Sequence, residues 1–105
     1  MKLKTDEKVT ENYLKLKIKE LGGLCYKWRA KDVRGVPDRI CVIPWMGIFF
    51  VEVKTLNGET SKIQEHTFQK IKNAGGLVFI VQGMPGVDKL TELIMRAKDE
   101  FERLP

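Results

Sequence analysis

The sequence predicts an α/β protein in which helices flank a mixed β-sheet, with elements in the order α-β-β-β-α-β-α. Three observations support this. Apolar residues recur at helical spacing in two segments, and a third helix is marked by Ser61 at its start and Ala74-Gly75-Gly76 at its end. Four other segments are apolar runs of strand length bounded by turn residues. A hairpin is followed by a helix and then by one more strand, which is typical of a sheet with both antiparallel and parallel neighbours. We expect a single domain over residues 1–105.

The first helix is expected over residues 6–21, with Thr5 as its N-cap and Gly22-Gly23 at its end. Its apolar stripe has helical spacing and consists of Leu14, Ile18 and Leu21. Glu11 lies at the edge of this stripe, so a helix that packs the stripe on a sheet carries one carboxylate toward that sheet.

The remaining elements follow from apolar runs and the turn residues between them. They are strands at 24–29, 39–43 and 48–55, a helix from Ser61 to about Ala74, a strand at 77–82, a turn at 84–86 and a last helix with apolar residues from Val87 to Leu104 at helical spacing. The second and third strands are joined by Pro44–Gly47, a short hairpin connection.

Composition excludes several classes of protein. The net charge of +5 and the pI near 9.3 favour a polyanionic partner. There is no run of roughly 20 apolar residues and no apolar signal-peptide core, so we expect a cytoplasmic or nucleoid-associated protein that is neither secreted nor in a membrane. The sequence has one histidine and one serine, which argues against a serine–histidine nucleophile. Its two scattered cysteines are expected as buried thiols and, with one histidine, argue against a zinc site. If the protein is an enzyme, the groups left for catalysis are carboxylates, lysine and a hard cation.

The predicted strand at 48–55 places charge in the most apolar part of the chain. Strand alternation puts Glu52 and Lys54 on one face together with Phe50. Asp38 begins the partner strand of the hairpin, so pairing could bring it close to both. With Glu11, three carboxylates would converge, and each pair repels by about 4 kcal/mol at 4 Å in a protein-like dielectric. A hard divalent cation such as Mg²⁺ or Mn²⁺ relieves this repulsion and assists phosphodiester hydrolysis.

The motif words around these residues resemble a known nuclease family. Pro37-Asp38, thirteen residues and then Glu52-Val53-Lys54 resemble the PD-(D/E)xK motif. The stretches VRGVPDRICV, FFVEVKTLNGETSKIQ and NAGGLVFIV resemble the VRR-NUC family of virus-type replication–repair nucleases, from the first helix to about Gln82.

The resemblance implies a restriction-endonuclease-like fold and a role for each matching residue. Asp38 and Glu52 would be metal-binding acids, Glu11 the acid of the first helix and the Val53 carbonyl a further metal ligand. Lys54 would be the catalytic lysine, with Gln64 near it on the following helix. Short, stand-alone members of the family resemble Holliday-junction resolvases that act as homodimers.

Simpler interpretations exist for each of these residues. Glu52 and Lys54 could form a solvent-facing pair on an edge strand, although Phe50 shares their face. Asp38 could be a turn residue after proline. Glu7 and Glu20 are alternatives to Glu11, but Glu7 lies in the first turn and Glu20 points away from the stripe. Ser61-x-x-Gln64 also has the spacing of a capping box, which is compatible with a site role for the glutamine.

Basic residues precede the predicted site in the run KWRAKDVRGVPDR. We expect a phosphate-contacting rim made of Lys27, Arg29, Lys31, Arg34 and Arg39, against the alternative of a merely solvated face. No recognition helix or zinc finger is evident, which favours recognition of DNA shape over sequence. The leading hypothesis is a Mg²⁺- or Mn²⁺-dependent, structure-selective DNA endonuclease that resolves Holliday junctions as a homodimer. The alternatives are a flap, nick or duplex nuclease and a non-catalytic DNA-binding module.

Overall fold

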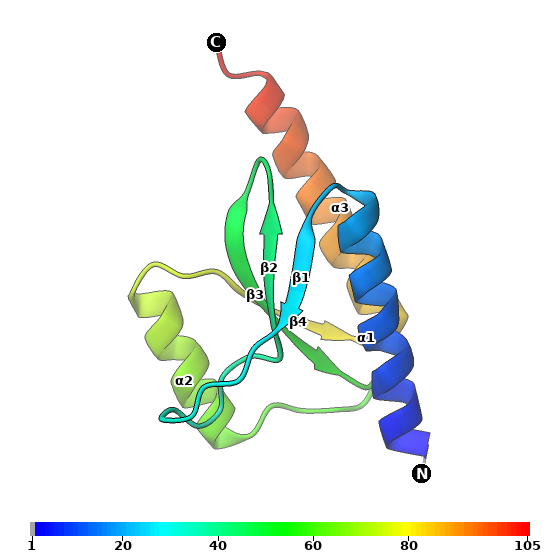
Figure 1. Ribbon diagram of the computed structural model, residues 1–105, viewed down its shortest axis with the longest axis vertical. Helices are drawn as coiled ribbons and strands as arrows, with labels where there is room; N and C mark the ends of the chain where they lie inside the picture. The colour runs from blue at the N-terminus through cyan, green and yellow to red at the C-terminus, as the bar shows by residue number, and fades with distance from the viewer. Residues whose placement is uncertain (1) are drawn as a thin grey trace.

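The structure has seven helices and strands in the order that the sequence predicted (Figure 1). This computed structural model describes residues 2–105, with side chains described from Asp6 onward. The elements are α1 (Lys2–Glu20), β1 (Leu24–Lys27), β2 (Arg39–Ile43), β3 (Gly47–Lys54), α2 (Lys62–Asn73), β4 (Val78–Gln82) and α3 (Gly83–Glu102). The order α-β-β-β-α-β-α is confirmed, and so is the mixed sheet flanked by helices.

The sheet has the strand order β1-β2-β3-β4. The first three strands pair antiparallel, and β3 pairs parallel with β4 because α2 crosses back between them. The β2–β3 hairpin closes with a bond from the Met46 N–H to the Ile43 carbonyl at 3.0 Å. Gly47 then starts β3 at φ 76°, a conformation that glycine adopts without steric cost.

The core lies on one face of the sheet, called here the helix-covered face. Phe49, Val51 and Val53 alternate onto this face, where they are fully buried. They belong to one buried cluster with apolar residues of α1 and α3, namely Leu14, Ile18, Val87, Leu90 and Ile94. Burying each such side chain contributes about 1.5–3 kcal/mol, so this face fixes the register of β3 and the direction of its other side chains.

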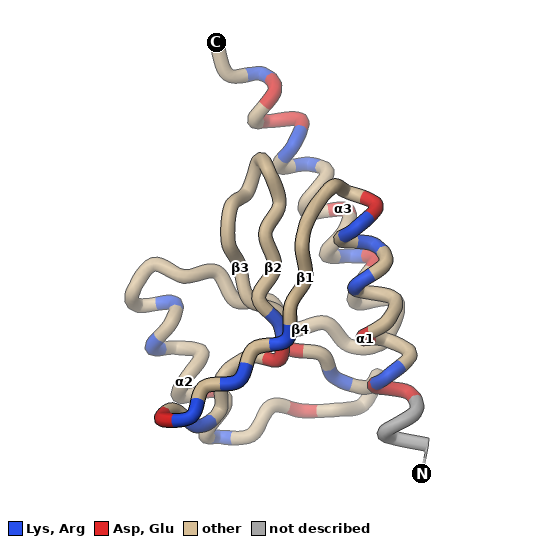
Figure 2. The backbone as a smooth tube through the Cα atoms, in the orientation of Figure 1, with Lys and Arg blue, Asp and Glu red and all other residues tan. Residues whose placement is uncertain are grey.

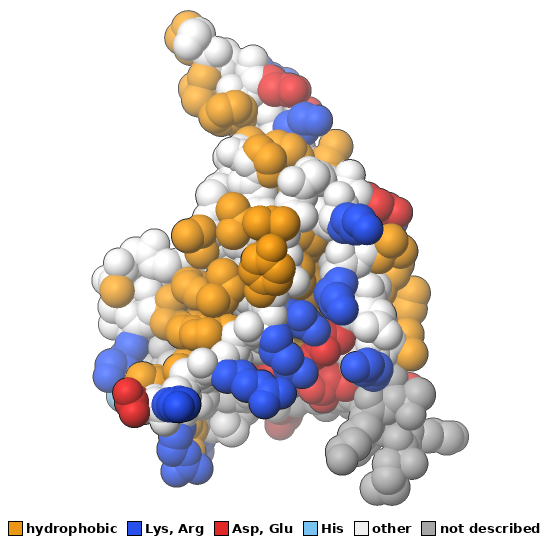
Figure 3. All heavy atoms as spheres, in the orientation of Figure 1, with side chains coloured by type: hydrophobic (Ala, Val, Ile, Leu, Met, Phe, Trp, Pro, Cys, Tyr) orange, Lys and Arg blue, Asp and Glu red, His pale blue; other side chains and the backbone are white. Residues whose placement is uncertain are grey.

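The opposite face, called here the open face, carries apolar residues that remain largely uncovered. Leu24, Tyr26 and Ile48 on it are each more than half exposed. Leu24 of β1 and Ile48 of β3 both pair with Val42 of β2, which lies between these strands. Figure 3 shows hydrophobic side chains gathered over these strands.

Some sequence predictions were wrong in detail. Thr5 is not an N-cap, because α1 already begins at Lys2. Residues 84–86 do not form a turn but belong to the first turn of α3, where proline is tolerated because the first N–H groups of a helix lack intrahelical acceptors. Phe101, in the last turn of α3, and Leu104, just after the helix, are exposed, because this end of the chain extends past the sheet (Figure 1).

The two cysteines are free, as expected, but they are not separated in space. Cys25 and Cys41 lie directly opposite each other in the β1–β2 pair; Cys41 is buried and Cys25 is partly exposed. No helix within residues 2–105 is long and apolar enough to span a bilayer.

Candidate metal and active site

Asp38 and Glu52 are linked where the β2–β3 hairpin opens. The register that pairs Arg39 with Val51 places these two residues opposite each other, one position beyond the start of β2. The Asp38 backbone N–H donates to Glu52 Oε1 at 3.2 Å, and Asp38 Oδ2 accepts from the Val53 backbone N–H at 3.0 Å. Each carboxylate is therefore held by the backbone of the other segment.

Lys54 and Gln64 complete a hydrogen-bonded group around Glu52. Lys54 Nζ lies 3.1 Å from Glu52 Oε2 and donates to Gln64 Oε1 at 2.9 Å. Gln64 Nε2 donates to the same Glu52 oxygen at 2.9 Å. The structure thus brings together Asp38, Glu52, Lys54 and Gln64, which come from the hairpin and from α2.

The first turn of α2 positions Gln64. Ser61 is the N-cap of α2, and its hydroxyl accepts from the Gln64 backbone N–H at 3.1 Å. Gln64 Oε1 accepts in return from the Ser61 backbone N–H at 3.0 Å, so the capping box is confirmed. The Gln64 side chain therefore both caps the helix and contacts Glu52 and Lys54.

Charge in this group is unbalanced. Glu52 is only 2% exposed. Burial raises the pKa of its carboxyl above the ordinary value, and the nearby Asp38 carboxylate raises it further, against the opposing effects of Lys54 and Gln64. Lys54 supplies the ammonium next to Glu52, and Asp38 adds a second carboxylate to the same hydrogen-bonded group. Such a group favours an additional cation.

Glu11 has a different partner. It is 8% exposed, and its Oε1 accepts from an Arg39 guanidinium nitrogen at 2.8 Å. Arg39 lies opposite Val51 in the register and so points to the helix-covered face, under α1. The structure pairs Glu11 with Arg39, while Asp38 and Glu52 bond to each other. Among the side chains described, from Asp6 onward, no three acids, histidines or cysteines are grouped to hold a metal ion.

The Val53 backbone faces the same end of the hairpin. Its N–H points toward Asp38, and the carbonyl of a strand residue points to the same side as its N–H. Continuing the β2–β3 register by two positions sets Val53 opposite Pro37, which has no N–H to donate. The Val53 carbonyl therefore lacks the backbone N–H donor that the neighbouring strand normally supplies in a β-sheet.

Four of the five predicted DNA-contacting residues lie together on the surface. Lys27, Arg29, Lys31 and Arg34 are exposed along the segment between β1 and β2, and Figure 2 shows basic positions following one another there. Arg39 differs, because it is 7% exposed and bonded to Glu11.

The segment between β1 and β2, called here the basic segment, is held against α2 by contacts that no sequence motif predicts. The Thr67 hydroxyl donates to the Arg34 carbonyl at 2.6 Å. Gly35, at φ 80°, packs so closely on Ile63 that a Cβ would lie 2.8 Å from it. The basic side chains are thus presented from an anchored segment.

The mixed sheet, with Asp38 and the Glu52-Val53-Lys54 triplet at the open end of its hairpin, is the arrangement that the resemblance to PD-(D/E)xK nucleases led us to expect. No family model matches the chain. A solved structure described as "VRR_NUC domain" superposes with a TM-score of 0.77 and 34% identity, covering 83% of this chain and 95% of that one. A protein of Acyrthosiphon pisum secondary endosymbiont phage 1, named "Putative nuclease p44", is 30% identical over 71 residues, which are 68% of this chain and 76% of the phage protein.

This chain belongs to the VRR-NUC family.

Proposed function

We propose that the chain is a metal-dependent DNA endonuclease whose cation site is the Asp38–Glu52 pair. One observation carries the proposal: two carboxylates are locked together at the end of a hairpin, one of them is buried, and a single ammonium accompanies them. A purely structural ion pair has no need of the second carboxylate, because repulsion between the two acids disfavours the charged form of Glu52.

The donor set fits a hard divalent cation. Carboxylate oxygens of Asp38 and Glu52, with the Val53 carbonyl, are oxygen ligands of the kind that Mg²⁺ and Mn²⁺ prefer. Glu11 would join them only by giving up its bond to Arg39. When bound, such an ion polarises a phosphoryl oxygen and lowers the pKa of water.

The side chains of the site have separate roles in hydrolysis. Water attacks the phosphorus, one P–O bond of the DNA backbone breaks, and the proton that the attacking water loses is returned to the leaving oxygen. The Lys54 ammonium, held by Gln64 and Glu52, donates to the phosphate and stabilises the negative charge that develops on it. Gln64 keeps Lys54 in place because its own position is fixed by the capping box. The basic segment before β2 binds the flanking backbone through phosphate contacts.

We further propose that the substrate is branched DNA and that the working unit is a homodimer in the cytoplasm or at the nucleoid of a host cell. Resolving a Holliday junction requires two cuts, which a two-fold dimer supplies from two equal sites. The open face supports this proposal, because Leu24, Tyr26 and Ile48 form an uncharged apolar surface of the kind that subunit contacts bury.

The nuclease proposal is tested by cleavage of three labelled substrates: a mobile four-way junction, a splayed arm and a linear duplex. Each is incubated with Mg²⁺, with Mn²⁺ and with EDTA. We expect cation-dependent cleavage that is fastest on the junction and is abolished in Lys54→Ala. The matched control is Lys19→Ala, an exposed lysine at the far end of α1, which should cleave normally. DNA binding without cleavage under every condition would overturn the proposal and leave a DNA-binding module.

Dimerisation is tested separately by light scattering. We expect the wild-type chain to have the mass of two copies and Tyr26→Lys, which places a charge on the open face, to have the mass of one. A monomeric wild-type chain at the concentration used for cleavage would contradict the homodimer.

A further inference from the structure

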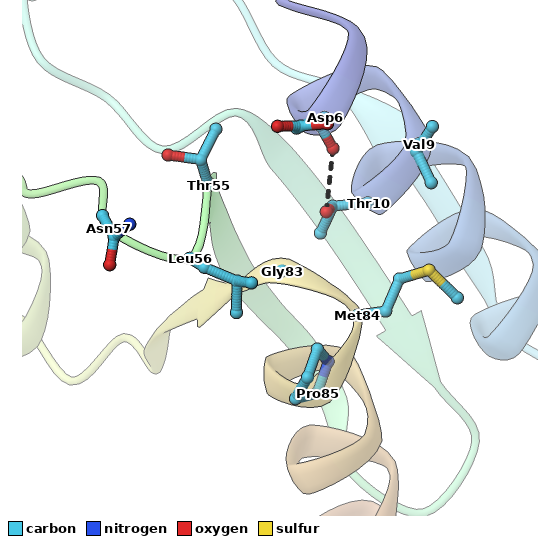
Figure 4. A pocket seen from close by; sticks show the side chains of 9 residues that line it. All are labelled: Asp6, Val9, Thr10, Thr55, Leu56, Asn57, Gly83, Met84 and Pro85. Atoms are coloured by element: carbon cyan, nitrogen blue, oxygen red, sulfur yellow. Dashed lines mark hydrogen bonds between the residues drawn. The ribbon is translucent and has the colours of Figure 1, made fainter. Parts of the chain in front are cut away.

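A cavity of about 420 Å³ opens beyond the end of β3, where α1, the segment after β3 and the start of α3 meet (Figure 4). Two of its lining residues are chain neighbours of proposed site residues. Thr10 directly precedes Glu11 on α1, and Thr55 directly follows Lys54. Both walls of the cavity therefore continue from elements that carry the site, and its volume is in the range of small-molecule sites.

The walls are mainly apolar. Val9 from α1 stands across from Leu56, and Met84 and Pro85 come from the first turn of α3 (Figure 4). Leu56 is 64% exposed and Met84 is 42% exposed, and both border this hollow. Apolar side chains that border a hollow and remain this exposed are suited to contact with an apolar ligand.

The polar groups of the cavity disfavour phosphate. Asp6 brings a carboxylate to it, and among the described residues that line it there is no lysine or arginine. The Thr10 hydroxyl is already used, because it donates to the Asp6 backbone carbonyl at 3.0 Å. The Asp6 carboxylate, the Thr55 hydroxyl and the Asn57 amide can bond to N–H and carbonyl groups of an uncharged ligand.

We propose that this cavity binds one unstacked nucleobase of the DNA, from a nucleotide next to the scissile phosphate. The inference rests on the proposed nuclease function, which supplies DNA at the candidate site. A base offers flat apolar faces to Val9, Leu56 and Met84, and its exocyclic amino group suits the carboxylate of Asp6. The sugar–phosphate stays outside, near Lys54.

The cavity makes the site selective for branched DNA. Removing a base from a duplex stack costs a few kcal/mol, and the cost is least where the base is already unpaired. A branch point offers such bases and a linear duplex does not. The energy from filling the cavity therefore adds to junction binding in full, whereas in duplex DNA it is offset by unstacking.

The test fills the cavity with a larger side chain. Met84→Trp does this, and Met95→Trp is the matched control, since Met95 is 40% exposed on the same helix and does not line the cavity. A junction with 2-aminopurine at the branch point is titrated with each protein in EDTA. No aromatic residue is among the described lining residues, so we expect base insertion by the wild-type chain and by Met95→Trp to raise the emission. Met84→Trp should give no rise, and its preference for junction over duplex should fall about tenfold.

Leu56→Ser serves as a second variant, because Leu56 is too exposed for its loss to disturb the core. It should lower the same preference. Unchanged emission and unchanged junction preference in both Met84→Trp and Leu56→Ser would overturn the base-binding cavity. Because these readouts are taken without a divalent cation, they are independent of cleavage: a wild-type chain that cleaves while both variants behave normally refutes the cavity alone, and a wild-type chain that inserts the base but never cleaves refutes the nuclease alone.

Discussion

Two nearly buried glutamates, Glu11 and Glu52, are treated in opposite ways by the fold. Glu11 faces a guanidinium at 2.8 Å on the helix-covered face, so its charge is matched by one full opposite charge. Glu52 lies at the open end of the hairpin, where it has Lys54 on one side and a second carboxylate, Asp38, on the other. Burial and Asp38 together raise the pKa of Glu52 despite that lysine.

The difference distinguishes a carboxylate whose charge is paired with a guanidinium from one that we propose binds a cation. The Glu11–Arg39 pair connects α1 to the first residue of β2, and both charges are accounted for. The Asp38–Glu52 pair is less favourable for the folded protein as it stands. A site that costs stability in this way is expected where a ligand relieves the cost.

The largest expected effect is on cleavage. Asp38→Asn keeps an oxygen that can accept from the Val53 N–H but removes one of the two charges that attract a cation. We expect the single-turnover cleavage rate to fall by about 10³-fold, because several kcal/mol of electrostatic stabilisation is lost. DNA binding, measured by fluorescence anisotropy, should persist. Cleavage at the wild-type rate would remove Asp38 from the site.

Removing the Glu11 carboxylate should lower stability, because Glu11 is the partner of the buried Arg39. Glu11→Ala leaves the Arg39 guanidinium buried and unpaired, and we expect a loss of about 3–5 kcal/mol in the free energy of unfolding by urea. The double variant Glu11→Leu/Arg39→Met should recover most of the lost free energy of unfolding, because it leaves no unpaired buried charge. Glu100→Ala is the control, because its pair with Arg103 is highly exposed and should matter little. If Glu11→Ala were as stable as the wild-type chain, the structural role would be wrong.

Divalent cations should stabilise the protein by binding to the Asp38 and Glu52 carboxylates. At about 100 times the dissociation constant, Mn²⁺ should add about 2.7 kcal/mol to the free energy of unfolding, because only the folded chain holds the site together. Asp38→Asn should lose this gain. An equal thermal shift in the wild-type chain and in Asp38→Asn would show that the ion binds elsewhere.

The smallest expected effect is the pH dependence of the metal-free protein. Because the pKa of Glu52 is raised in the folded state, the folded chain holds its proton more tightly than the unfolded chain does. This contribution to stability is complete below the unfolded pKa and is lost as the pH rises through the folded one. We expect Glu52→Gln, unfolded in EDTA, to lack this part of the pH dependence and to melt higher than the wild-type chain at neutral pH. A lower melting temperature for Glu52→Gln would show that its bonds to Lys54 and Gln64 outweigh the cost of its charge.

Much of the fold was predictable because the signals are local. Alternation in β3 and the turn at Pro44–Gly47 fix the hairpin register, and that register places Asp38 opposite Glu52. The capping box likewise placed Gln64 at the start of α2. These features depend on residues that are close in the chain or joined by one short turn.

Other features depend on contacts between distant elements. Arg39 belongs to a basic run by sequence, yet strand alternation turns it under α1 toward Glu11. The cavity beyond the end of β3 is formed by three elements that meet only in the folded chain, and the first turn of α3 replaced an expected loop. Neither hydrophobic periodicity nor a sequence motif predicts such contacts between distant elements.

Anomalous diffraction from a crystal soaked in Mn²⁺ tests the account most directly. We predict a manganese peak within ligand distance of both Asp38 and Glu52 oxygens, with Glu11 still bonded to Arg39. A fully occupied manganese at another site, with the Asp38–Glu52 pair empty and its hydrogen bonds unchanged, would contradict it.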